Sequence, residues 1–206
     1  MLVVKSLAQP GYALQRSSGV CRAAVGGVPL NAALGVMREY AGFFEWKKRD
    51  LKELGVVEEL LRALNKGTEF ALHSPRIQRP DPPDCACLDR HGRCIGIEVV
   101  EAVCDEAARR NAAGESVTRV WRPGEFSWHV RELLEAKDKK TYLGGPYHEI
   151  WVCVFTDEPM LSVEQARNEV EHEVFGPLSQ ISRAFLLMSY DSASRSYPVY
   201  HLNLRQ

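Results

Sequence analysis

Long apolar runs, a dense set of cysteines and a strong net charge are all missing from this 206-residue chain. The longest apolar stretches, 150–155 and 184–188, fall well short of the ~18 residues of a membrane span, so we expect no membrane association. Six cysteines are too few for a disulfide scaffold, which indicates a reducing, cytoplasmic compartment. The 26 basic and 27 acidic residues exclude a uniformly basic surface but leave room for a local basic patch.

Common cofactor signatures are missing as well. The sequence contains neither GxxxxGK[ST] nor GxGxxG, so nothing in it supports an ATP or NAD site. Cys85, Cys87, Cys94 and Cys104 lack the paired C-x₂₋₄-C spacing that is typical of structural zinc sites. We therefore interpret them chiefly as small buried apolar residues.

Acidic residues are absent before Glu39, and the segment up to that point is rich in Ala, Gly, Val and Ser. This composition is typical of a transit peptide or a flexible tail. We therefore predict two parts, a flexible N-terminal extension over residues 1–38 and one folded domain over residues 39–206.

The remaining sequence alternates between helical and strand patterns. Periodic apolar stripes predict helices at about 43–66, 105–112, 125–142 and 162–176. Apolar alternation or short apolar runs predict strands at 68–73, on both sides of a turn within 84–101, and at 149–156, 181–190 and 198–204. This order predicts an α/β fold, a three-layer sandwich around a central mixed sheet.

The most informative stretch is DCACLDRHGRCIGIEVVE, which begins at Asp84. Gly92 closes its loop, because a three-residue hairpin loop favours a left-handed residue at the last position. That turn pairs Leu88 with Cys94. Counting outward along the same register places Asp84 opposite Glu98, on one face of the sheet. Facing carboxylates destabilise a sheet, and a bound cation is a common compensation.

The helix predicted over 125–142 carries a lysine within its apolar stripe. Lys137 follows Leu133 by four positions and Val130 by seven, while Lys140 lies at the edge of the stripe. A buried ammonium group needs a partner, so we expect Lys137 to reach a carboxylate or a phosphate oxygen. The two tryptophans near this helix, Trp121 and Trp128, are interpreted as core or lid residues rather than stacking platforms.

These residues together resemble the PD-(D/E)XK restriction-endonuclease-like superfamily. The likeness covers about residues 43–204 and lies in Pro83-Asp84 opening a strand, a short turn, and Glu98-Val99-Val100 in the next strand. The resemblance implies a restriction-endonuclease-like fold and metal-dependent hydrolysis of phosphodiester bonds in nucleic acid, DNA in the first place. It also implies that Asp84 and Glu98 bind Mg²⁺ or Mn²⁺, with the carbonyl of Val99 as a further oxygen ligand. A homodimer is a further expectation.

The chain departs from the family pattern at position 100, where the family lysine is replaced by Val100. We predict Lys137 as the substitute, and Glu101 as a further catalytic candidate that strand alternation turns to the opposite face. Two alternatives remain open. One is a catalytically inactive nuclease-like module for nucleic-acid binding or assembly. The other is a small-molecule or regulatory domain in which Asp84 and Glu98 form ordinary ion pairs.

Overall fold

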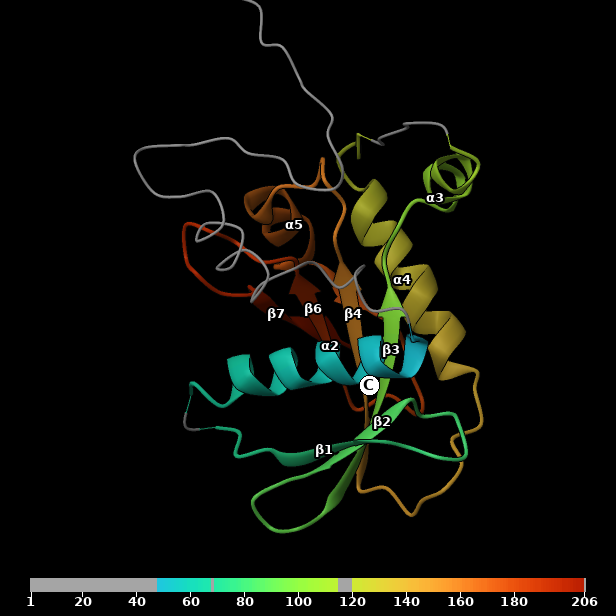
Figure 1. The fold of residues 1–206 in the computed structure, drawn as a ribbon, viewed down its shortest axis with the longest axis vertical. Coiled ribbons are helices and arrows are strands. Elements are labelled where there is room, and N and C mark those ends of the chain that lie inside the picture. The colour runs from blue at the N-terminus through green and yellow to red at the C-terminus, as the bar shows by residue number, and fades with distance from the viewer. Residues whose placement is uncertain (1–47, 68, 115–119, 206) are drawn as a thin grey trace, which may run out of the picture. The chain divides into compact units, whose positions relative to one another are not determined.

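The structure is a computed structural model that describes residues 48–67, 69–114 and 120–205 (Figure 1). The predicted extension over 1–38 and the first residues of the helix predicted from 43 lie outside these ranges. In the described part of the chain, none of the helices has both the length and the apolar character needed to cross a membrane.

Within the described residues, seven strands form one sheet in the order β1-β2-β3-β4-β6-β7-β5. The strands are β1 (His73–Ile77), β2 (Cys85–Leu88), β3 (Cys94–Glu101), β4 (Glu149–Thr156), β5 (Val174–Phe175), β6 (Arg183–Met188) and β7 (Val199–Leu204). The helices are α2 (Arg49–Leu64), α3 (Asp105–Ala112), α4 (Glu125–Asp138) and α5 (Val163–Val170). β1, β2 and β3 pair antiparallel, β3 and β4 pair parallel, and β4 and β6 pair parallel. The prediction of an α/β fold with a mixed sheet is confirmed.

Helices flank the sheet on both faces. On one face, Val152 and Val154 of β4 share a buried core with Phe126 and Val130 of α4 and with residues of α5. On the other face, the ammonium group of Lys52 in α2 lies 4.9 Å from the ring centre of Phe155. β4 is buried at nearly every position, as expected of a strand covered on both sides. The arrangement is compatible with a three-layer sandwich.

The first strand begins later than the sequence predicts. We expected a strand over 68–73, whereas β1 spans His73–Ile77. The side-chain amide of Asn65 explains the difference, because it donates to the carbonyl of Leu72 at 2.7 Å and accepts the N–H of Leu72 at 2.9 Å. These bonds take the place of strand pairing, and Phe70 instead packs edge-on against Trp151.

Two helices end earlier than predicted. α4 ends at Asp138 instead of about 142, and the Asp138 carboxylate accepts the backbone N–H groups of Ser179 and Gln180, each at 2.8 Å. α5 begins as predicted, with the Ser162 hydroxyl accepting the N–H of Gln165 at 3.1 Å. It ends at Val170 instead of 176, because residues 174–175 are extended and pair with β7.

Candidate metal centre

The β2–β3 hairpin has the predicted register, and this register positions both predicted acids. Leu88 pairs with Cys94, and Cys85 pairs with Ile97. Gly92 adopts φ +74°, the left-handed conformation that the loop requires, and its N–H donates to the carbonyl of Asp89 at 2.9 Å. One position beyond the Cys85 pair, the same register places Asp84 beside Glu98.

The carboxylate of Asp89 holds the turn in this conformation. Its Oδ1 accepts the backbone N–H groups of His91 and Arg93, both at 2.9 Å, and its Oδ2 accepts Nε of Arg93 at 2.7 Å. Burial opposes ionisation of this carboxyl, but the hydrogen bonds from Arg93 and His91 lower the pKa of Asp89 to about 2. The turn is therefore fixed by a charged hydrogen-bond acceptor as well as by glycine.

Gly96 allows the loop before β2 to lie against β3. A Cβ atom at this position would stand 2.8 Å from Cδ1 of Ile150 and 3.0 Å from Cγ of Pro83, so no larger residue fits without movement. Pro83 thus packs against β3, and this contact positions the next residue, Asp84, beside β3. Asp84 is 1% exposed, and its Oδ2 accepts the backbone N–H of Val99 at 2.8 Å.

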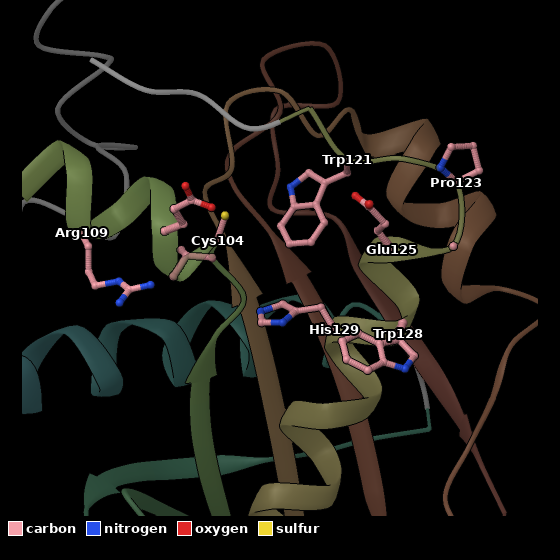
Figure 2. Close-up of a pocket in the computed structure, with 10 residues that line it drawn as sticks. Cys104, Arg109, Trp121, Pro123, Glu125, Trp128 and His129 are labelled. Carbon is pink, nitrogen blue, oxygen red and sulfur yellow. The ribbon is translucent and has the colours of Figure 1, made fainter. Parts of the chain in front are cut away.

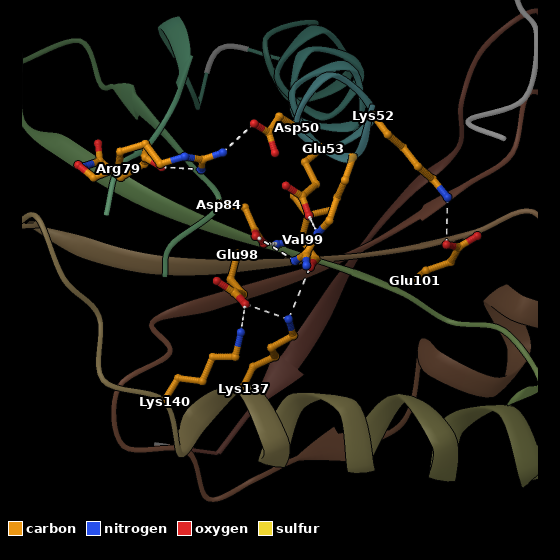
Figure 3. A network of polar contacts seen from close by, with 12 residues as sticks. Asp50, Lys52, Glu53, Arg79, Asp84, Glu98, Val99, Glu101, Lys137 and Lys140 are labelled. Carbon is orange, nitrogen blue, oxygen red and sulfur yellow. Dashed lines mark hydrogen bonds and ion pairs between the residues drawn. The ribbon is translucent and has the colours of Figure 1, made fainter. Parts of the chain in front are cut away.

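Glu98 is fully buried and receives two ammonium groups from the end of α4 (Figure 3). Nζ of Lys137 and Nζ of Lys140 each lie 2.6 Å from the same oxygen, Oε1 of Glu98. Nζ of Lys137 is also 3.4 Å from the carbonyl oxygen of Val99. The other oxygen of Glu98, Oε2, is buried without a hydrogen-bond partner in the described structure. Lys137 therefore reaches a carboxylate, one of the two kinds of partner expected from its place in the apolar stripe.

A third carboxylate joins these two acids. One oxygen from each of Asp81, Asp84 and Glu98 lies within 4.8 Å of the other two, and we call these three residues the acid cluster. Asp81 is exposed, whereas Asp84 and Glu98 are buried. The donors are all oxygens, which suits a hard divalent cation such as Mg²⁺. The acid cluster could therefore hold a divalent ion.

The electrostatics of the acid cluster reflect this crowding. Burial, and next the negative charge of Glu98, raise the pKa of Asp84 to about 6, although the N–H of Val99 acts in the opposite direction. Burial lowers the pKa of Lys140, but its hydrogen bond to Glu98 and the charge of that group outweigh burial and leave the pKa raised. The two buried acids therefore repel each other, and Arg49, Lys137 and Lys140 balance part of their charge.

Several residues around Asp84 were not predicted from the sequence. Glu53 of α2 is 9% exposed, and its Oε1 accepts Nε of Arg49 at 2.5 Å. Nη2 of Arg49 reaches Oδ1 of Asp84 at 3.5 Å. A signal for Glu53 existed, because it precedes Val56 by three positions and so lies in the apolar stripe of its helix. Asp81 gave no such signal, since it stands in a proline-rich loop.

The structure does not bring Glu101 to the acid cluster. The pairing of β3 with β4 continues without a shift to Glu101 and Phe155, so strand alternation turns Glu101 away from Glu98. Its Oε2 accepts Nζ of Lys52 in α2 at 2.8 Å (Figure 3). As a catalytic candidate Glu101 needed β3 to bulge or to end there; β3 does end at Glu101, without a bulge, and the carboxylate contacts Lys52 instead of joining the acid cluster. The carbonyl of Val99, in contrast, does lie at the cluster, beside Lys137.

Comparisons with known proteins give no family for this chain. A scan of family models and searches of curated proteins and of solved structures each found no match. Function is therefore inferred from the side chains themselves. The alternative of ordinary ion pairs is met in part, because Arg49 reaches Asp84 and both Lys137 and Lys140 bind Glu98. In the described residues an arginine is paired with Asp84 but not with Glu98.

Proposed function

We propose that the chain is a metal-dependent nuclease of the PD-(D/E)XK type, which hydrolyses phosphodiester bonds, with DNA as the preferred nucleic acid. One observation carries the proposal: two buried carboxylates converge, Asp84 just before β2 and Glu98 on β3, with Asp81 beside them. Arg49, Lys137 and Lys140 offset part of this buried negative charge, but Oε2 of Glu98 keeps no hydrogen-bond partner in the described residues and can accept a further cation. The resemblance of Pro83-Asp84 and Glu98-Val99 to the family motif supports the same conclusion.

The residues present fit a hard divalent cation, Mg²⁺ or Mn²⁺. Asp84 and Glu98 would hold it, and Asp81 and the carbonyl of Val99 offer further oxygen ligands. Glu98 supports this fit, since its Oε2 is buried and has no hydrogen-bond partner in the described residues. When bound, such an ion lowers the pKa of an attacking water and stabilises charge on the scissile phosphate.

Lys137 has the role that the family assigns to a lysine on the strand. Its ammonium group lies between Oε1 of Glu98 and the carbonyl of Val99, at 2.6 and 3.4 Å. It therefore orients Glu98 and supplies positive charge where a phosphate would approach. Lys140 shares the same oxygen of Glu98 but is more exposed, with 37% of its side-chain surface accessible against 14% for Lys137. We assign Lys137 the catalytic role and Lys140 a role in phosphate attraction.

The proposal is tested by incubating the purified protein with supercoiled plasmid and with single-stranded DNA in Mg²⁺ or Mn²⁺. We expect cleavage that EDTA abolishes and that falls at least 100-fold in Asp84→Asn, because the ligand charge is lost while the acceptor for Val99 is kept. Glu149→Gln is a matched control, since Glu149 forms its ion pair with Arg183 on β6. Equal cleavage by wild type and Asp84→Asn would remove the nuclease proposal.

A second function, a non-catalytic nuclease-like module, is favoured by one observation. Three cations, Arg49, Lys137 and Lys140, already contact the two buried acids, and Val100 stands where the family has lysine. Such a module would bind nucleic acid without cutting it. Metal titration separates the two functions, because a metal centre gains thermal stability with Mg²⁺ or Mn²⁺ and the module does not.

A further inference from the structure

A second feature lies at the opposite end of α4 from Lys137, around the start of this helix (Figure 2). It is an open cavity of about 720 Å³, which we call the aromatic cavity. Its lining comes from three segments: the connection between β3 and α3, α3 itself, and residues 121–129. The size lies within the range of small-molecule sites in proteins. No part of the acid cluster lines this cavity.

Aromatic side chains form the walls of this cavity. Trp121 is 5% exposed and is held edge-on to Phe126, with ring centres 5.4 Å apart. Its ring is also 5.6 Å from that of His129, at an angle of 35°. Of the two roles expected for these tryptophans, core or lid, the 59% exposure of Trp128 excludes the core for this residue. The buried Trp121 fixes one wall through its contacts with Phe126 and His129, and the accessible indole of Trp128 offers a planar surface on which another flat ring stacks.

Hydrogen-bond donors and acceptors also line the aromatic cavity. Arg109 carries donors, and Glu106 and Glu125 carry acceptors, of which Oε2 of Glu125 already accepts the backbone N–H of Arg122 at 3.0 Å. Nε2 of His129 is buried without a hydrogen-bond partner in the described residues. A nucleobase has flat apolar faces and an edge that both donates and accepts hydrogen bonds, and this combination matches the cavity.

The aromatic cavity and the acid cluster lie along the same helix. Trp128 precedes Lys137 by nine residues, which is about 13 Å along an α-helix. His129, Leu133 and Lys137 follow one another at steps of four and so share one side of α4. Trp128 itself lies about 180° around the helix axis from Lys137, because nine residues at 100° each bring it to the opposite side of α4.

We propose that the aromatic cavity binds one unpaired nucleobase of a single-stranded nucleic acid, with Trp128 as the stacking surface. Base binding does not rest on the proposed nuclease function. The cavity thereby favours nucleic acid that carries a single-stranded segment, because a paired base is not free to enter.

The test is fluorescence anisotropy with a labelled single-stranded 20-mer and a duplex of the same length, both in EDTA. Trp128→Ala weakens single-strand binding about tenfold, and Trp128→Phe by threefold or less, because phenylalanine keeps a stacking face. Duplex affinity stays within twofold. Val174→Ala is the matched control, since Val174 is also a large exposed apolar residue, 47% accessible, on β5.

The outcomes separate this inference from the nuclease proposal. Single-strand binding that Trp128→Ala leaves unchanged overturns the inference, and so does an equal loss on single-stranded and duplex DNA. A wild-type protein that binds single strands through Trp128 but never cleaves them supports base binding and removes the nuclease. Cleavage in Mg²⁺ that persists in Trp128→Ala with unchanged single-strand affinity removes base binding and keeps the nuclease.

Discussion

Glu98 and Glu101 stand three positions apart on β3 and share several features. Each has one oxygen bound by lysine, and each has a second oxygen that is buried without a hydrogen-bond partner in the described residues. They differ in their neighbours, because Glu98 is fully buried beside Asp84 and Asp81, whereas Glu101 lies on the other face with Lys52. The comparison teaches that the convergence of several acids distinguishes the candidate metal centre. A buried carboxylate oxygen without a hydrogen-bond partner does not distinguish it, because both glutamates have one.

The largest expected effect is on catalysis. Glu98→Gln lowers Mg²⁺-dependent cleavage at least 100-fold, because it removes a ligand charge from the acid cluster. Glu101→Gln stays within about threefold of wild type. The measurement is the initial rate of plasmid nicking, with a melting curve for each variant to verify folding. A reversed order of the two variants would contradict the comparison.

The second effect is on metal-linked stability. At a metal concentration of about 100 times the dissociation constant, mass action stabilises the folded wild-type protein by about 2.7 kcal/mol. We expect Glu101→Gln to keep this gain and Glu98→Gln to lose it. Melting curves in EDTA and in increasing Mn²⁺ provide the measurement. A gain of equal size in both variants would place the ion elsewhere.

The third effect concerns pH in the absence of metal. The pKa of Asp84 is about 6 in the folded state, above its value near 4 in the unfolded chain, so the folded state binds its proton more tightly. Stability from this group is therefore complete below pH about 4 and is lost as the pH rises through about 6, by roughly 2 to 3 kcal/mol. Urea unfolding in EDTA from pH 4 to 8 measures the loss.

Asp84→Asn provides the control for this pH dependence. The amide oxygen still accepts the N–H of Val99, but the group no longer titrates. The decline in stability between pH 4 and 8 should therefore flatten in this variant. A decline as steep as in wild type would assign it to another group.

A smaller effect is expected at Gly96. The substitution Gly96→Ala places a Cβ against Pro83 and Ile150 and costs about 1–3 kcal/mol, as overpacking does. Because Pro83 carries Asp84 into place, the variant also loses part of the stability gained with Mn²⁺. The Lys52–Glu101 pair lies on the sheet face opposite the acid cluster. The changes in unfolding free energy caused by Gly96→Ala and by Glu101→Gln should therefore add in the double variant. Thermal melts of both single variants and the double variant measure this additivity.

The positions of Asp84, Glu98 and Lys137 could be predicted from the sequence, because they follow from turn geometry and from the periodicity of strands and helices. The hairpin register followed from Gly92, and it brought Asp84 and Glu98 together because side chains alternate strictly along strands. The apolar stripe of α4 likewise placed Lys137 on the inward side of its helix. Sequence periodicity carries this information over a few residues, and in these segments it was sufficient.

Contacts between distant segments could not be predicted in the same way. The amide of Asn65 replaces strand pairing at Leu72, and the Asp138 carboxylate binds the N–H groups of a loop some forty residues away. Arg49 and Asp81 reach the cluster from a helix and a loop whose placement depends on the whole fold. Such bonds depend on tertiary geometry, which no local pattern encodes.

The shared oxygen of Glu98 has one further consequence. Lys137 in α4 and Lys140 just after this helix neutralise that side chain, and Arg49 approaches Asp84 from α2. The negative charges are therefore largely balanced by the protein's own cations. We therefore expect the chain to fold without a metal ion, unlike small zinc domains that remain unfolded when the metal is removed. For the proposed nuclease, a chelator should abolish cleavage reversibly without unfolding the protein.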